Sequence, residues 1–330
     1  MSLLTVSDLQ THFKLPKGVL RAVDGVSFSI AKGETVGLVG ESGCGKSTLG
    51  RSLLRLETPT AGQVALDGED ILPLQGARLR SLRKRMQMIF QDPFASLNPR
   101  HSIGSILETP LQVHGLGDRA QRRRQVERLL DRVGLPRSAL GRYPHEFSGG
   151  QRQRLGIARA LMLQPDLVVC DEPVSALDLS IQAQILNLLV EMKREFGLSY
   201  LFISHDLSVV QYFADRVLVM YLGRIVESAD RRSLWSAPRH PYTQALLDAV
   251  PDPSRHRQAA PLGGDLPSPQ DLPSGCRFHP RCPRATALCT TQEPLLSDSG
   301  NGHLVACHHP QAPQAPQTAD TQTSVISFVH

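Results

Sequence analysis

The octet Gly40-Glu41-Ser42-Gly43-Cys44-Gly45-Lys46-Ser47 decides how the rest of this chain is interpreted. It fits the pattern G-x-x-x-x-G-K-S/T, in which a glycine-rich loop surrounds the phosphates of a nucleotide. An apolar run, residues 35–39, precedes the octet, and residues 48–54 continue it as a helix should, so a strand-to-helix turn is expected here. Glycine permits the tight backbone path that lets successive N–H groups point at phosphate oxygens.

The polar residues of the octet have expected roles in nucleotide binding. The helix that opens at Lys46 adds free N–H groups and a positive dipole end. Lys46 should reach the β- and γ-phosphates, and the Ser47 hydroxyl should coordinate Mg²⁺. A chance match to the octet occurs in roughly one in a hundred chains of this length. The predicted contacts to ATP are Gly40, Glu41, Ser42, Gly43, Cys44, Gly45, Lys46, Ser47 and Thr48.

Two acidic residues directly follow a second apolar run, residues 167–170. Ligands gather at the carboxyl edge of a parallel sheet, so Asp171 is expected to hold Mg²⁺ through water. Glu172 is then placed to polarise the attacking water. A mere strand terminus is the alternative interpretation of such a pair. Gln91 and His205 also stand just beyond predicted strand ends, which favours one shared site for all four residues.

A second phosphate-binding helix start is indicated by Ser148-Gly149-Gly150-Gln151. This small, glycine-rich turn opens a helix that continues through Leu161. The plain alternative is a capped helix that begins with a flexible turn.

Length and composition set the broad class. The chain has 330 residues, 41% of them hydrophobic, and a net charge of +5, with no apolar window long enough to span a bilayer. Its start lacks a signal peptide pattern, so a cytosolic location with reduced cysteines is expected. The arginine cluster at 122–124 favours a solvated helix face, because no aromatic platforms accompany it, and nucleic acid is not implied.

Strands that alternate with helices predict an α/β fold, a P-loop NTPase core around a mostly parallel sheet. A helical subdomain is inserted at about 94–154, and the composition changes sharply near Pro251. The expected organisation is an ATPase domain over 1–250, a Pro/Gly-rich linker over 251–275, a cysteine-rich metal-bound extension over 276–309 and a disordered tail over 310–330.

These motifs resemble those of the ATP-binding subunits of ABC transporters, in order and spacing, over about residues 3–250. The octet matches the Walker A loop, 167–172 the Walker B strand with its catalytic glutamate, and 148–151 the family signature. The resemblance further implies a Q-loop at Gln91, a D-loop at Ser175-Ala176-Leu177-Asp178, a switch histidine at His205, an adenine-stacking ring at Phe13, catalytic roles for Glu172, His205 and Gln91, and Mg²⁺ ligation by Ser47, Gln91 and Asp171.

The family architecture implies a mechanism. Two such subunits meet head to tail, so that each ATP lies between one Walker A loop and the partner's Ser148-Gly149-Gly150. Binding closes the dimer, hydrolysis through Glu172 with His205 reopens it, and the motion passes to membrane subunits near Gln91.

Finer resemblance comes from residues 91–100, from residues 239–247 and from the C-terminal cysteines. These are similar to the oligopeptide, dipeptide and nickel importer branch, closest to the second ATPase subunit of a dipeptide permease. That branch implies a homologous ATPase partner, two transmembrane permease subunits, a periplasmic binding protein, and a peripheral place on the cytoplasmic face of the inner membrane. Cargo rests on analogy alone, so nickel or haem remain alternatives, as does a soluble ABC ATPase without a transport role.

Four cysteines near the end of the chain, Cys276, Cys282, Cys289 and Cys307, follow the pattern C-x5-C-x6-C-x17-C. Structural zinc usually needs a closer cysteine pair, although neighbouring histidines keep Zn²⁺ open. Four thiolates without such a pair suit an iron–sulfur cluster, and relatives in this branch carry a [4Fe–4S] centre at matching cysteines. Free thiols are the third alternative. In this Pro- and Gly-rich region, a metal would stand in for a core.

Overall fold

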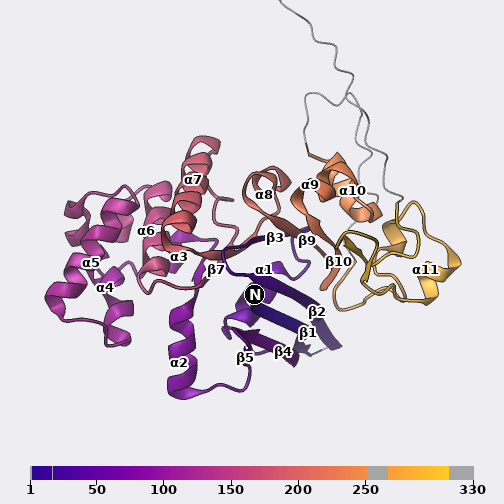
Figure 1. Cartoon of the computed structure of the whole chain (residues 1–330), viewed down its shortest axis with the longest axis horizontal. Helices are drawn as coiled ribbons and strands as arrows, with labels where there is room; N and C mark the ends of the chain where they lie inside the picture. Colours follow the sequence, from indigo (N-terminus) through magenta and orange to yellow (C-terminus); the bar gives the residue numbers. More distant parts are fainter. Residues whose placement is uncertain (1, 17, 251–266, 312–330) are drawn as a thin grey trace, which may run out of the picture.

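A sheet of eight strands runs through the middle of the molecule (Figure 1), in a computed structural model that describes residues 2–16, 18–250 and 267–311. From edge to edge the strands are β11 (Ser297–Asp298), β12 (Leu304–Val305), β10 (Arg224–Asp230), β9 (Arg216–Tyr221), β3 (Thr35–Val39), β8 (Ser199–Ile203), β7 (Leu167–Asp171) and β6 (Met86–Ile89). The five strands from β9 to β6 are parallel, whereas β10, β12 and β11 are antiparallel to their neighbours. The expected parallel core is therefore present within a mixed sheet.

Burial on both faces explains the continuous apolar sequence of the central strands. Every residue of β3, β7 and β8 is buried, as parallel strands covered by helices require. Figure 1 shows α8 (Leu207–Phe213) on one side of this sheet and α1 (Lys46–Leu53) on the other.

A second, antiparallel sheet lies beyond α1 (Figure 1). Its order is β2 (Gly18–Ala31), β1 (Ser2–Leu15), β4 (Ala61–Leu66) and β5 (Glu69–Asp70). Helix α1 contacts β1 and β2 of this sheet as well as β7 and β8 of the main sheet. The helix that follows the octet is thereby fixed between the two sheets, and so is the loop that leads into it.

The inserted helices form a lobe at one end of the molecule (Figure 1). It holds α3 (Pro93–Ser96), α4 (Ile103–Val113), α5 (Arg119–Arg132), α6 (Gly149–Leu161) and 3₁₀ turns at Arg137–Gly141 and Pro144–Glu146. Asp118 and Gln121 form a capping box at the start of α5. Gly134 follows its end with a φ of 72°. The helices of the lobe run from Pro93 to Leu161, whereas the predicted span was about 94–154. Helix α2 (Gly76–Arg85), before the lobe, was missed by the sequence patterns.

Further helices lie outside the lobe. They are α7 (Leu179–Phe196), α9 (Arg231–Ser236), α10 (Pro241–Asp248), α11 (Ala287–Thr291) and a 3₁₀ turn at His279–Arg281. On α7, Ile185, Leu188, Leu189 and Met192 are buried, whereas Ile181 and Phe196 are only partly buried. Gly197 ends this helix in the left-handed conformation.

The cysteine-rich region packs against the ATPase domain and extends its main sheet. Glu227 and Ser228 of β10 pair with Val305 and Leu304 of β12, and β11 pairs with β12 in turn. Of the predicted linker 251–275, residues 251–266 lie outside the described residues, and 267–275 form turns without helix or strand. Of the predicted disordered tail 310–330, residues 312–330 also lie outside the described residues.

Candidate nucleotide-binding site

The octet forms a tight loop between the end of β3 and the start of α1, as predicted. Gly40 has a φ of 150° and Gly45 a φ of 109°. A Cβ on Gly40 would lie 2.2 Å from the carbonyl oxygen of Met220, and one on Gly45 would lie 2.0 Å from that of Ala22. Glycine is therefore required twice over, by the backbone conformation and by the close approach of β9 and β2.

Lys46 is buried at the first position of α1, and its ammonium group faces back into the loop. Its Nζ donates hydrogen bonds to the carbonyl oxygens of Gly40 (2.8 Å) and Glu41 (2.9 Å). The Sγ of buried Cys44 lies 4.0 Å from the same nitrogen. The positive charge is thus held beside the loop's own backbone, next to the N–H groups expected to bind phosphate.

The remaining residues of the octet differ in exposure. Ser42 and Gly43 are exposed at the outer turn of the loop, while Ser47 and Thr48 are half-buried in α1.

Ser47 and Asp171 meet across the sheet edge, as predicted. The Ser47 hydroxyl donates a 2.7 Å hydrogen bond to Oδ1 of Asp171, which is buried at the end of β7. Burial raises the pKa of Asp171, and the hydrogen bond from Ser47 and the positive charges of Arg51 and Lys46 act in the opposite direction. A hydroxyl and a carboxylate side by side are the oxygen donors that suit Mg²⁺.

Glu172 is the meeting point of the predicted catalytic residues. Its Oε2 accepts a 3.0 Å hydrogen bond from Nε2 of Gln91 and lies 3.1 Å from Nδ1 of His205. The backbone of Glu172 has a φ of 46°, an uncommon conformation for a residue other than glycine. Its N–H donates to the carbonyl oxygen of Ile203 in β8 (3.0 Å). The three side chains come from different strand ends, and the sheet brings them together.

The predicted signature and D-loop lie against each other within the chain. Ser148 caps α6 by accepting the N–H of Gln151, whose side chain in turn accepts the N–H of Ser148. A Cβ on Gly150 would lie 2.6 Å from Cγ2 of Ile181, and Gly149 faces Leu177 of the D-loop. Asp178 caps α7 by accepting the N–H of Ile181 at 3.0 Å.

Phe13 lies half-buried on β1, opposite Leu20 of β2. Its stacking on adenine stays a prediction.

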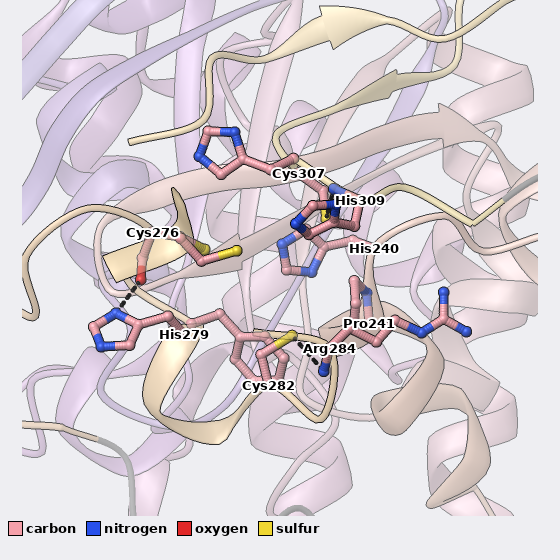
Figure 2. A pocket seen from close by; sticks show the side chains of 11 residues that line it. His240, Pro241, Cys276, His279, Cys282, Arg284, Cys307 and His309 are labelled. Carbon is pink, nitrogen blue, oxygen red and sulfur yellow. Dashed lines mark hydrogen bonds between the residues drawn. The ribbon is translucent and has the colours of Figure 1, made fainter. Parts of the chain in front are cut away.

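The four C-terminal cysteines surround one small cavity (Figure 2), together with His240, Pro241, Phe278, His279, Arg284, His308 and His309. The pKa of Cys307 is raised to about 11, chiefly by burial and also by the neighbouring thiols of Cys276, Cys282 and Cys289, while the hydrogen bond from the His309 N–H acts in the opposite direction. Among residues 2–16, 18–250 and 267–311, however, no three His, Cys, Asp or Glu side chains are placed to hold a metal ion as they stand. The predicted metal-bound extension is therefore not supported by the observed side-chain arrangement.

Two contacts to the octet were missed by the sequence patterns. The hydroxyl of Tyr242, in α10, accepts the backbone N–H of Glu41 at 2.9 Å. The guanidinium of Arg281 makes a paired contact to both carboxylate oxygens of Glu41, at 2.7 and 2.9 Å. No local signal marks either residue, because each lies more than 200 positions from Glu41 along the chain.

The described part of the chain contains no helix that is both long enough and apolar enough to cross a membrane.

A phosphate loop between β3 and α1, paired acids at the end of β7, and a helical lobe with a glycine-rich helix start together define an ATP-binding cassette domain. Comparison with known proteins agrees. Residues 23–175 match the family model described as "ABC transporter", and residues 226–289 match "Oligopeptide/dipeptide transporter, C-terminal region".

Similar proteins cover nearly the whole chain. The oligopeptide transport ATP-binding protein AppF of Bacillus subtilis is 53% identical over 319 residues, 93% of this chain and 97% of that protein. The dipeptide transport ATP-binding protein DppF of Escherichia coli is 50% identical over 313 residues, 92% of this chain and 93% of that protein. A dimeric, post-hydrolysis structure of the ATP-binding cassette MJ0796 with ADP and phosphate superposes with a TM-score of 0.64 at 28% identity, covering 69% and 99% of the two chains. The chain belongs to the ABC transporter family, among its oligopeptide and dipeptide transport ATP-binding proteins.

Proposed function

We propose that this chain is the ATP-hydrolysing subunit that energises an importer of dipeptides or oligopeptides across the inner membrane. The observation that carries the ATPase assignment is the convergence of Gln91 and His205 on Glu172, beside the Ser47–Asp171 pair. Peptide cargo is supported by relatives at 50–54% identity that are named as oligopeptide, peptide or dipeptide transport proteins. The protein then acts from the cytoplasmic face, bound to two permease subunits that a periplasmic binding protein supplies with peptide.

In this proposal the chain's own residues bind the phosphates and direct the water. Lys46 exchanges its bonds to the Gly40 and Glu41 carbonyl oxygens for bonds to the β- and γ-phosphates. Glu172 accepts a proton from water while the water oxygen bonds to the γ-phosphorus and the bond to the β–γ bridging oxygen breaks, releasing ADP and phosphate. Ser47, Asp171 and Gln91 would hold Mg²⁺, which would supply neutralisation of the phosphate charge.

The signature residues serve a second subunit. Ser148, Gly149 and Gly150 stand at the start of a 13-residue helix, where free N–H groups and the helix dipole attract anions. One chain cannot use two phosphate-binding helix starts on the same nucleotide without bringing α1 and α6 together. Figure 1 shows α6 in the helical lobe and α1 between the two sheets. We therefore assign the signature to the ATP of a homologous partner subunit.

Substitution of the proposed base separates binding from hydrolysis. Glu172→Gln should retain ATP binding and lose turnover in the reconstituted complex, because an amide cannot accept the proton of the water. Lys46→Ala should weaken equilibrium binding of ATP itself. Glu191→Gln, on an exposed position of α7, is the matched control and should keep both properties. Turnover by Glu172→Gln at the wild-type rate would refute the assignment of the base.

The four C-terminal thiols belong to the same proposal as ligands of a [4Fe–4S] cluster, with Zn²⁺ as the alternative. The support is the donor set itself, because Cys276, Cys282, Cys289 and Cys307 border one cavity, and thiolates are the ligands that such clusters use. Their side chains would have to rotate from the arrangement observed.

The test for the cluster is chemical analysis of anaerobically purified protein. We expect about four irons and acid-labile sulfide per chain. Cys282→Ser should lower the iron content, while Cys170→Ala, which alters a buried cysteine of β7 far from the cavity in sequence, should leave it unchanged. A colourless preparation that contains one zinc per chain would establish the alternative.

A further inference from the structure

The cysteine-rich region reaches directly into the phosphate loop. Arg281 lies at the end of the 3₁₀ turn His279–Arg281, immediately before Cys282. Its two terminal nitrogens contact the two carboxylate oxygens of Glu41, the second residue of the loop, at 2.7 and 2.9 Å. The Arg281 side chain is 5% exposed and that of Glu41 27% exposed. A paired guanidinium–carboxylate contact of this kind fixes orientation as well as distance.

Glu41 is held on its backbone as well as on its side chain. Its N–H donates to the Tyr242 hydroxyl at 2.9 Å, and its carbonyl oxygen accepts from Lys46 Nζ at 2.9 Å and from the N–H of Cys44 at 3.3 Å. Glu41 therefore connects two residues: its carboxylate contacts Arg281, and its carbonyl oxygen contacts Lys46, which is expected to bind phosphate.

The segment around Arg281 is itself docked firmly. Phe278 is 1% exposed and packs against the rings of Tyr221, Tyr242 and His240. Arg277 forms a buried ion pair with Asp24 and donates to the carbonyl oxygen of Leu222. The β9–β10 turn that carries this oxygen also touches the octet, since the N–H of Gly223 donates to the Cys44 carbonyl oxygen at 2.8 Å. The region thus supports the loop from two directions.

We propose that Arg281 is a positioning residue for ATP binding, which sets the backbone of the phosphate loop at Glu41 from the C-terminal cysteine-rich region. This proposal rests on the proposed function, because it assumes that the octet binds ATP. Loss of Arg281 releases the Glu41 side chain, while its backbone keeps the hydrogen bonds to Tyr242, Lys46 and Cys44. The Lys46 ammonium and the loop N–H groups then start from a less closely defined arrangement. The affinity for the nucleotide falls, because ordering the loop then occurs on binding and its entropy cost reduces the binding free energy.

The test is equilibrium binding of a fluorescent ATP analogue to the full chain, with competition by ATP, at a temperature well below the melting point of every variant. Arg281→Gln should weaken ATP binding about tenfold, and Arg281→Lys, which keeps the charge but not the paired geometry, should weaken it less. Glu41→Gln should weaken binding as Arg281→Gln does, and the double variant should be no weaker than either single one, because both remove one interaction.

Glu293→Gln is the matched control. Glu293 joins the same region to the ATPase domain through Arg224 (2.8 Å) and also lies 3.7 Å from Arg277 of its own region, so its loss weakens docking without touching Glu41. We expect unchanged ATP affinity in this variant. In turnover measurements, Arg281→Lys should raise the KM for ATP more than it lowers kcat.

Wild-type affinity in Arg281→Gln, with the protein folded, would overturn the positioning role and leave the proposed function intact. Additive losses in the double variant would overturn it as well. If Arg281→Gln does not fold, Arg281→Lys and Glu41→Gln decide the question by the same comparison. Failure of the proposed function has a different signature, in which Lys46→Ala binds ATP as tightly as the wild type.

Discussion

Alanine at Gly45 tests whether the loop needs glycine for its backbone conformation or for space. At a φ of 109° an L-residue is strained, by about 1–2 kcal/mol. The new methyl carbon would also lie 2.0 Å from the Ala22 carbonyl oxygen, so that the loop or β2 must shift at a further cost of about 1–3 kcal/mol. The total expected loss in the free energy of unfolding for Gly45→Ala is therefore about 2–5 kcal/mol.

Gly43→Ala separates these two contributions. Gly43 has a φ of 81°, but an added Cβ would have no heavy atom within 4 Å. We expect Gly43→Ala to lose only the conformational part, about 1–2 kcal/mol. Urea unfolding measures the stability of both variants and of the wild type, and equilibrium binding of ATP reports whether the loop still closes on phosphate. Equal losses of stability in the two variants would refute the steric reasoning.

Three further outcomes follow from buried polar groups. Burial raises the pKa of Asp24, but hydrogen bonds from Arg277 and His12 outweigh burial and hold that pKa below its ordinary value. A carboxyl whose pKa is lower in the folded than in the unfolded state stabilises the fold at pH values above the unfolded-state pKa. That stabilisation is lost as the pH falls through the folded-state pKa. Asp24→Asn should therefore be less stable than the wild type at pH 7 in urea unfolding, with a gap that narrows toward pH 3; a constant gap would contradict this. Glu227 is fully buried, accepts hydrogen bonds from the N–H groups of Arg239 and His240, and contacts His303. Glu227→Ala should therefore lower the free energy of unfolding by about 3 kcal/mol and speed amide hydrogen exchange in β12. Unchanged protection of the β12 amides would show that this carboxylate does not anchor the region. Tyr242→Phe leaves the Glu41 N–H without its acceptor and should lower the free energy of unfolding by about 1 kcal/mol. The denaturant midpoint measures this loss, which is smaller if a water molecule replaces the hydroxyl.

The sequence patterns predicted those parts of the site whose chemistry is local. A phosphate loop is read from eight consecutive residues, and Asp171 and Glu172 follow a strand that is apolar throughout. The parallel core then required that Gln91, Glu172 and His205 meet, because each stands just after a strand of one sheet. Both inferences depend on a few residues and one rule of sheet topology.

The sequence patterns could not predict contacts between segments that are far apart in the chain. Arg281 and Glu41 are 240 positions apart, and nothing in either segment indicates the other. Helix α2 has one buried residue, Leu82, so its apolar periodicity is weak. Strands β11 and β12 have two residues each, too few for an alternating pattern to be visible. The metal-bound state of the cysteines was predicted from their spacing, from the composition around them and from the resemblance to relatives, and it stays a prediction, because the side chains of the described residues, as placed, form no metal site.

The two-residue strand β12 covers part of the outer edge of β10, where the Ala306 N–H also donates to the Val226 carbonyl oxygen at 2.8 Å. During synthesis on the ribosome, Val305 is added roughly 75 residues after Asp230, which corresponds to about 4–15 seconds at usual elongation rates. Throughout that interval this edge of the nearly finished sheet has unpaired N–H and carbonyl groups, which are a template for pairing with another nascent chain. A segment translated well after β10 is therefore the one that covers this edge, and truncations before it are expected to aggregate rather than to yield a smaller working ATPase.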